Sequence, residues 1–275
     1  MVKYHGIKYH GRAALRIVSS CAAEHMHVEQ RLRAILGGLL AVPGLVPPGA
    51  VLDAGANNGA DSIFLSKLLP ERQVVSVEPT RTNVRFIEHE TRRHKCSNIE
   101  VIHAGLSNAS GQSSYAQEIE RGAGSTQLNE RTWAHKGGGE RIAFNVTTVD
   151  ALFEGRALAL AHWDVEGMEL AVIQGARRTI ARDRPFFTVE TFPQSSPQRY
   201  QDLMGAVVRL GYQPHEIINE TCGSPRDCRN FLCVPSERLA AFRSAAAASL
   251  GSGRPLDRFG DYTLQLKYSI VFSNR

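Results

Sequence analysis

Two acidic residues, Asp53 and Glu78, each end a short apolar run, in an arrangement suited to binding a nucleoside. Asp53 follows the run 50–52 and opens a glycine-containing turn, and Glu78 follows the run 73–77. A carboxylate at the end of the second run can accept hydrogen bonds from both hydroxyls of a ribose, and one in the first turn can hold an ammonium group. The pair therefore indicates a ligand that carries both a ribose and an amino group.

The segments around these acids predict one strand–turn–helix–strand unit. Residues 50–52 and 73–77 are too short for helices and rich in valine, so we expect buried parallel strands. Residues 59–69 place apolar side chains at helical spacing. The carboxyl ends of both strands then face one crevice, where Gly55 and Gly59 let the backbone approach a ligand closely. S-adenosylmethionine carries both of the groups that the two acids would bind.

We predict that seven residues of this unit bind S-adenosylmethionine: Asp53, Gly55, Ala56, Asn57, Gly59, Glu78 and Pro79. The glycine spacing is a weak signal by itself, because Asn57 stands where a dinucleotide site has its second glycine. For the turn alone, the alternative is an ordinary connection between a strand and a helix. Gly105 and Leu106 are further cofactor candidates, since they follow a predicted third strand at 98–104, near where an adenine edge would lie.

A second pair of acids, Asp164 and Glu190, ends the fourth and fifth predicted strands. In a doubly wound sheet these strand ends border the same crevice, so we predict Asp164, Glu190 and His162 as catalytic residues. Asp164 or His162 would accept a proton from a substrate hydroxyl, and Glu190 would orient that hydroxyl. Alternation along the strand could instead turn His162 into the core. The two acids could also bind a hard cation, so a divalent metal is left open and no metal ligand is assigned.

Four motifs then follow one another along the chain: Asp53-Ala54-Gly55-Ala56-Asn57-Asn58-Gly59, Glu78-Pro79, Thr148-Val149-Asp150 and Asp164-Val165-Glu166-Gly167-Met168-Glu169. With these motifs, residues 50–192 resemble the FkbM family of class I methyltransferases. The resemblance implies a Rossmann-like, seven-stranded methyltransferase sheet that uses S-adenosylmethionine, commonly to methylate a hydroxyl of a sugar, a polyketide or another natural product. Glu166 and Glu169 have a simpler interpretation, as first-turn carboxylates that satisfy the free amides of a helix.

The segment 108–140 is polar and glycine-rich, and we predict that it forms a mobile lid over the crevice. Ser125, near its centre, is a further cofactor-binding candidate. A lid would exclude water from a charged reaction centre. The alternative is a plain surface connection.

The chain is predicted to be an α/β protein in three parts: a helical N-terminal segment, residues 1–49, a methyltransferase core, residues 50–235, and a C-terminal extension, residues 236–275. Its 275 residues and 43% hydrophobic content suffice for one such core. In the first part, residues 28–40 show helical spacing. Residues 262–272 alternate enough to be a strand, which would cover a sheet edge or pair with another subunit, so a homo-oligomer is left open.

The sequence also bears on the cell compartment and on metal binding. No membrane-length apolar run and no signal-like N-terminus are evident, so we expect a cytoplasmic protein without a membrane partner. Five cysteines form an odd set, which favours reduced thiols. The last three, Cys222, Cys228 and Cys233, fit no common zinc spacing.

These observations lead to three functional hypotheses. The favoured one is an S-adenosylmethionine-dependent O-methyltransferase acting on a small molecule. The second is a methyltransferase of RNA or another macromolecule, which the net charge of +5 would suit; the scattered positions of the basic residues argue against a nucleic-acid partner. The third is a non-catalytic module that only binds the cofactor, against which Asp164 and Glu190 argue.

Overall fold

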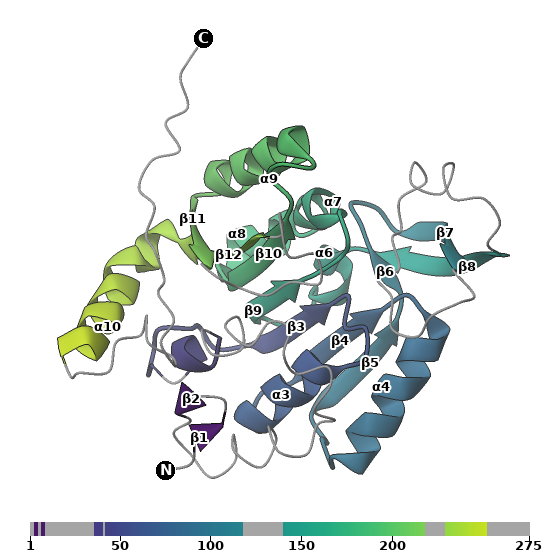
Figure 1. The fold of residues 1–275 in the computed structure, drawn as a ribbon, viewed down its shortest axis with the longest axis horizontal. Helices are drawn as coiled ribbons and strands as arrows, with labels where there is room; N and C mark the ends of the chain where they lie inside the picture. The colour runs from purple at the N-terminus through teal and green to yellow at the C-terminus, as the bar shows by residue number, and fades with distance from the viewer. Residues whose placement is uncertain are drawn as a thin grey trace.

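The computed structural model describes residues 3–4, 7–8, 36–40, 42–117, 140–217 and 229–251. Its centre is a seven-stranded sheet with the order β11-β12-β10-β9-β3-β4-β5 (Figure 1). The strands are β3 Ala50–Ala54, β4 Val74–Glu78, β5 Ile99–His103, β9 Leu158–Trp163, β10 Phe186–Thr191, β11 Tyr212–Ile217 and β12 Arg229–Pro235. Neighbours are parallel except for β12, which is antiparallel to both β10 and β11. The predicted α/β fold with its doubly wound sheet is confirmed.

Helices cover both faces of this sheet, so its central strands are buried on both sides (Figure 1). They are α3 Ala60–Leu68, α4 Arg81–Arg93, α6 Val149–Leu152, α7 Glu169–Gln174, α8 Arg177–Asp183, α9 Pro197–Arg209 and α10 Leu239–Gly251, with the 3-10 helix η1 Ser236–Arg238. On β3, Leu52 packs into the core that contains α7, α8 and α9 side chains, whereas Val51 packs into the core that contains α3 and α10 side chains. Burial on two faces explains why these strands appear as continuous apolar runs.

The sequence predicts a single helix over residues 171–181, but the structure divides this segment into α7 and α8 around Gly175. The Asp150 amide donates to the Gly175 carbonyl at 2.9 Å, and the Asp150 carboxylate accepts from the amides of Arg178 and Thr179. A second helix can therefore begin at Arg177, because a side chain from α6 satisfies its first free amides.

A smaller sheet follows β5 in the chain and contains β6 Gly105–Leu106, β7 Gly111–Gln117 and β8 Glu140–Thr147, in the order β6-β8-β7. β8 pairs antiparallel with the whole length of β7, through residues 140–146. Within the predicted lid segment, residues 108–140, the structure thus has the strand β7 and the first residue of β8, Glu140. Residues 118–139, including Ser125, lie outside the described residues, so the lid itself stays a prediction.

The terminal segments are described only in part. Residues 36–40 are helical, as their spacing predicts, but β1 Lys3–Tyr4 and β2 Ile7–Lys8 form a short antiparallel pair within a segment predicted to be helical. The alanine-rich stretch of the C-terminal part forms α10, whereas residues 262–272 lie outside the described ranges. Among the residues that the structure describes, no helix has the length and apolar character needed to cross a membrane.

Candidate active site

The predicted acidic site residues lie on or directly after four neighbouring strands, β4, β3, β9 and β10, which are parallel and end at the same edge of the sheet. The winding reverses beside β3, since β4 and β5 lie on one side of it and β9 and β10 on the other. In open α/β sheets, ligands bind outside the carboxyl ends of the strands at such a point. The topology therefore brings Asp53, Glu78, Asp164 and Glu190 to the edge where a ligand would bind.

The two glycines of the turn after β3 are required by contacts within the protein. Gly55 has φ +80°, and a Cβ there would lie 1.7 Å from the carbonyl oxygen of Asp164. Gly59 has φ +74°, and a Cβ there would lie 3.0 Å from Cγ1 of Ile87 on α4. Both positions also favour glycine through their left-handed backbone. The turn after β3 and the turn after β9 are thus in direct backbone contact, reinforced by the Asp164 amide, which donates to the Ala54 carbonyl at 3.0 Å.

Glu78 connects the end of β4 to both neighbouring segments. Its carboxylate is 4% exposed and accepts from the Asn57 amide at 2.9 Å, the Thr80 amide at 2.8 Å and the Asn83 side-chain amide at 3.3 Å. Burial raises the pKa of Glu78, and these hydrogen bonds act in the opposite direction. The Thr80 side chain also forms a hydrogen bond with this carboxylate, so a ribose hydroxyl that binds here would share the Glu78 oxygens with donors of the protein. This acceptor position at the edge fits the predicted cofactor.

Three other predicted cofactor residues adjoin Glu78. The Ala56 amide donates to the Val77 carbonyl at 3.1 Å, and Asn57 is exposed with φ +49°. The carbonyl of Pro79 lies 3.0 Å from Nε2 of His103. Sequence reasoning missed His103, although it ends β5 as Glu78 ends β4 and the two residues are register partners.

Asp53 lies below this rim, in a buried row of polar side chains. It is 1% exposed and accepts a hydrogen bond from Ser62 of α3 at 2.5 Å. Its register partner His162 is 3% exposed, and Nδ1 of His162 lies 2.9 Å from Oγ1 of Thr188. This is the environment of the core histidine that was the alternative to a catalytic role. His162 therefore has no place in the mechanism proposed below.

The other predicted catalytic acids lie at the ends of β9 and β10. Asp164 is half-buried, and Glu190 is 8% exposed and pairs in register with Asn230. Beyond Asp164 the turn continues through Glu166 at φ +51° and Gly167 at φ +91°. A non-glycine residue such as Glu166 in the left-handed backbone region costs about 1–3 kcal/mol, which the surrounding contacts must offset. The turn that carries Asp164 is consequently held in a defined shape.

Glu169 has a more specific environment than the sequence indicated. Its side chain is buried at 6% exposure, and Oε1 accepts from the Gly167 amide at 3.0 Å. Burial raises the pKa of Glu169 to about 7, and the nearby Glu166 carboxylate adds to this effect. Glu169 satisfies an amide of the turn, as its first-turn position suggested, but it does so as a carboxyl group that can be neutral near pH 7.

Gly105 and Leu106, the candidates near the adenine edge, are both buried in β6. A Cβ on Gly105 would lie 2.5 Å from the ring of Phe144 on β8, so this glycine is required by packing between β6 and β8. Their predicted contact with a cofactor is left untested by this arrangement.

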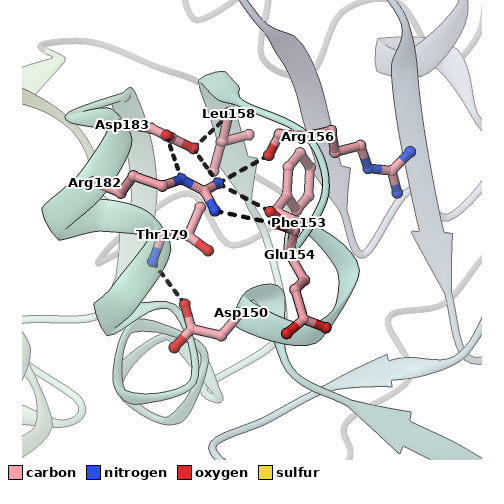
Figure 2. Close-up of polar contacts among 8 residues, drawn as sticks. All are labelled: Asp150, Phe153, Glu154, Arg156, Leu158, Thr179, Arg182 and Asp183. Atoms are coloured by element: carbon pink, nitrogen blue, oxygen red, sulfur yellow. Dashed lines mark hydrogen bonds and ion pairs between the residues drawn. The ribbon is translucent and has the colours of Figure 1, made fainter.

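The motif Thr148-Val149-Asp150 has a structural function, and Figure 2 shows its third residue, Asp150, beside Thr179 and Arg182 of α8. Thr148 caps α6 by accepting from the Ala151 amide at 3.1 Å, and Asp150 accepts from the Thr179 amide at 2.8 Å and the Arg178 amide at 3.1 Å. Arg182 of α8 donates to the carbonyls of Phe153 and Arg156, at 2.9 Å each. The motif therefore fixes α8 against the segment that leads into β9.

In the parts of the chain that the structure covers, no group of three or more histidine, cysteine or acidic side chains is arranged to hold a metal ion. Cys96 and Cys233 are buried free thiols, and Cys233 lies in β12. Cys222 and Cys228 fall outside the described ranges.

The strand order, the single reversed strand and the position of the acids define the class: this is the fold of S-adenosylmethionine-dependent methyltransferases. Residues 53–221 match the family described as "Methyltransferase FkbM domain". The chain belongs to the FkbM methyltransferase family.

One solved structure of the same family agrees with this assignment at the level of the fold, and a second solved structure is also similar. An FkbM methyltransferase from Methylobacillus flagellatus KT is similar at 19% identity and a TM-score of 0.50, over 80% of this chain and 52% of that one. This chain thus spans about half of that protein's length. Cofactor-bound Rv0187 from MTB is similar at 14% identity and a TM-score of 0.48, over 82% and 88% of the two chains. No curated protein matches the sequence.

Proposed function

We propose that this chain transfers a methyl group from S-adenosylmethionine to a hydroxyl of a small molecule such as a sugar or a natural product. The observation that carries the proposal is the placement of acids on both sides of β3. Glu78 ends β4 on one side and Asp164 follows β9 on the other, and the backbone contact between Gly55 and Asp164 joins the two turns. A cofactor site and an acceptor site would therefore be adjacent.

On the β4 side, Glu78 would hold the ribose hydroxyls, and Asp53 would bind the amino-acid tail directly or through water. The backbone of Gly55, Ala56, Asn57 and Gly59 would form the wall of the site, with Pro79 beside the ribose. When bound, the cofactor supplies a methyl group on a positively charged sulfur. These residues orient it and need no chemistry of their own.

On the β9 side, the half-buried carboxylate of Asp164 would accept the proton of the acceptor hydroxyl as the oxygen attacks. Glu190 would orient the acceptor from the neighbouring strand. In the balanced reaction a carbon–oxygen bond forms and a carbon–sulfur bond breaks, the electron pair stays on sulfur, and the proton passes to Asp164. No metal is assigned to this reaction.

The test is transfer from methyl-labelled S-adenosylmethionine to a panel of glycosides, polyketides and RNA. We expect label in a small hydroxylated compound. Label in RNA would instead support a macromolecular substrate, and binding of the cofactor product without transfer to any class would support a non-catalytic module.

Asp164→Asn separates the role of the base from cofactor binding. We expect turnover to fall about 100-fold or more while the dissociation constant for S-adenosylhomocysteine changes less than about 2-fold. Glu154→Gln, a change at an exposed position in the turn before β9, is the control. Unchanged turnover in Asp164→Asn would remove Asp164 from the mechanism.

A further inference from the structure

Two serines of α3, Ser62 and Ser66, face the sheet one helical turn apart and are almost fully buried, at 0% and 2% exposure. A buried hydroxyl costs free energy unless it forms a hydrogen bond, so both need a partner. Each donates to an oxygen at 2.5 Å, Ser62 to Asp53 and Ser66 to Asn98. The two hydrogen bonds have the same length but lie at opposite edges of the sheet, since Asp53 is near the carboxyl end of β3 and Asn98 directly precedes the amino end of β5.

Ser66 belongs to a structural contact at the amino ends of the strands. Its partner Asn98 precedes β5, and the Asn98 side-chain amide donates to the carbonyls of Leu69 and Arg72, at 2.9 and 2.7 Å. These bonds connect the end of α3 to the start of β5. They are remote from the edge where the acids gather.

Ser62 acts at the other end, on an acid of the candidate site. It donates to Oδ2 of Asp53, near the carboxyl end of β3, and a hydrogen bond to a charged acceptor is stronger than one between neutral groups. Fixing one carboxylate oxygen also sets the direction of the other, because the two are joined in one rigid group. Ser62 comes from the helix that follows the glycine turn, so it also ties that helix to the strand before the turn.

Resting on the proposed function, we infer that Ser62 is a positioning residue for the cofactor: its hydroxyl holds the Asp53 carboxylate in the orientation that binds the amino-acid tail. The ribose is held separately, by Glu78, whose partners are Asn57, Thr80 and Asn83. Loss of the Ser62 hydroxyl should therefore weaken binding of the tail without weakening binding of the nucleoside.

Two ligands separate these contributions. S-adenosylhomocysteine carries the amino-acid tail, and 5′-methylthioadenosine has the same nucleoside without it. With Ser62→Ala, calorimetry should show a dissociation constant for S-adenosylhomocysteine raised about 10-fold, and one for 5′-methylthioadenosine changed by less than about 2-fold. Ser62→Cys keeps the volume but donates poorly, so it should give the same pattern if the alanine variant does not fold. Ser62→Thr retains the hydroxyl and should restore the affinity.

Ser66→Ala is the matched control, since it removes a buried hydroxyl and a hydrogen bond of equal length from the same helix. It should lower the melting temperature while leaving both dissociation constants unchanged. The inference is overturned if Ser62→Ala and Ser62→Cys bind S-adenosylhomocysteine as the wild type does, if they weaken both ligands equally, or if Ser66→Ala has the same effect. If the wild-type protein binds neither ligand, the proposed function fails as well. If the wild type binds both ligands and only the Ser62 variants give an unexpected result, the inference about Ser62 alone fails.

Discussion

Glu169 illustrates how burial changes the chemistry of a single carboxyl group. In the sequence it is one of several acids at strand ends and helix starts, but its side chain is 6% exposed and its pKa is raised to about 7. Glu78 is also buried, and its pKa is raised. Asp183 accepts hydrogen bonds from the Leu158 amide and from Arg182. Its pKa is lowered, although burial alone would raise it. At the residue scale, acids that look equivalent in the sequence therefore respond differently to pH.

Replacing Glu169 with glutamine should stabilise the protein in alkaline buffer. The pKa is about 7 in the folded state against an ordinary 4.5, so between these pH values the folded protein retains a proton that the unfolded chain has lost. The free energy of unfolding of the wild type therefore falls as pH rises through this range, by about 3 kcal/mol at about 1.4 kcal/mol per pH unit. The side chain of Glu169→Gln stays neutral at every pH. The free energy of unfolding of this variant should therefore exceed that of the wild type by about zero at pH 4.5 and by about 3 kcal/mol at pH 8.

Urea unfolding of both proteins at the two pH values measures this difference. The control Glu154→Gln changes an exposed acid. Its free energy of unfolding should stay within about 0.5 kcal/mol of the wild-type value at both pH values. A Glu169→Gln advantage that is the same at pH 4.5 and pH 8 would contradict a proton held by Glu169.

At the scale of elements, side-chain caps and close backbone contacts decide how helices join the sheet. α8 begins where Asp150 reaches its amides, and the turn after β9 fits against the turn after β3 only because Gly55 has no side chain. Gly175 shows the same principle, since a Cβ there would lie 2.1 Å from the carbonyl oxygen of Ser107. These contacts position the strand ends that carry the acids.

Asp150→Ala should destabilise the fold by about 1–2 kcal/mol, because it removes the cap of α8. Although burial alone would raise it, the hydrogen bonds from the Thr179 and Arg178 amides hold the pKa of Asp150 below its ordinary 3.8. A lowered pKa in the folded state means that this contribution is present above the ordinary value and is lost as pH falls through the folded-state pKa. Denaturant unfolding at pH 7 should reveal the cost, with Glu154→Ala as the exposed control in the same region. An unchanged unfolding midpoint in Asp150→Ala would show that the cap contributes nothing.

At the scale of the whole molecule, the sheet gathers residues that are distant in the chain at one edge. Glu78, Asp164 and Glu190 come from three strands, and the two core clusters on opposite faces hold those strands in register. A ligand bound at this edge would contact several strands at once, so its binding free energy would add to the stability of the entire fold.

S-adenosylhomocysteine should therefore raise the melting temperature of the protein. At 100 times its dissociation constant the expected gain is about 2.7 kcal/mol, or about 5–10 °C for a domain of this size. NAD⁺ is the control ligand and should give no shift. Glu78→Gln should reduce the shift with S-adenosylhomocysteine, because the ribose loses its charged acceptor. Equal shifts with both ligands, or none with either, would argue against the proposed cofactor site.

Local patterns in the chain determined most of the sheet and the helices that flank it. Apolar runs of strand length, helical spacing and glycine turns depend on residues that are neighbours in sequence, so they predicted the strands that carry Asp53, Glu78, Asp164 and Glu190. The interior position of His162 remained an alternative, because alternation along a strand does not say which face is covered.

Only the tertiary structure decided the contacts between segments that are far apart in the chain. It revealed that Gly55 is required by the Asp164 carbonyl, that Asp150 caps α8, and that Ser62 holds Asp53. It also divided one predicted helix into α7 and α8 and showed the strand β7 within the predicted lid segment. Such contacts depend on how separate elements pack in space, and the periodicity of any one segment carries no information about the partner it will meet.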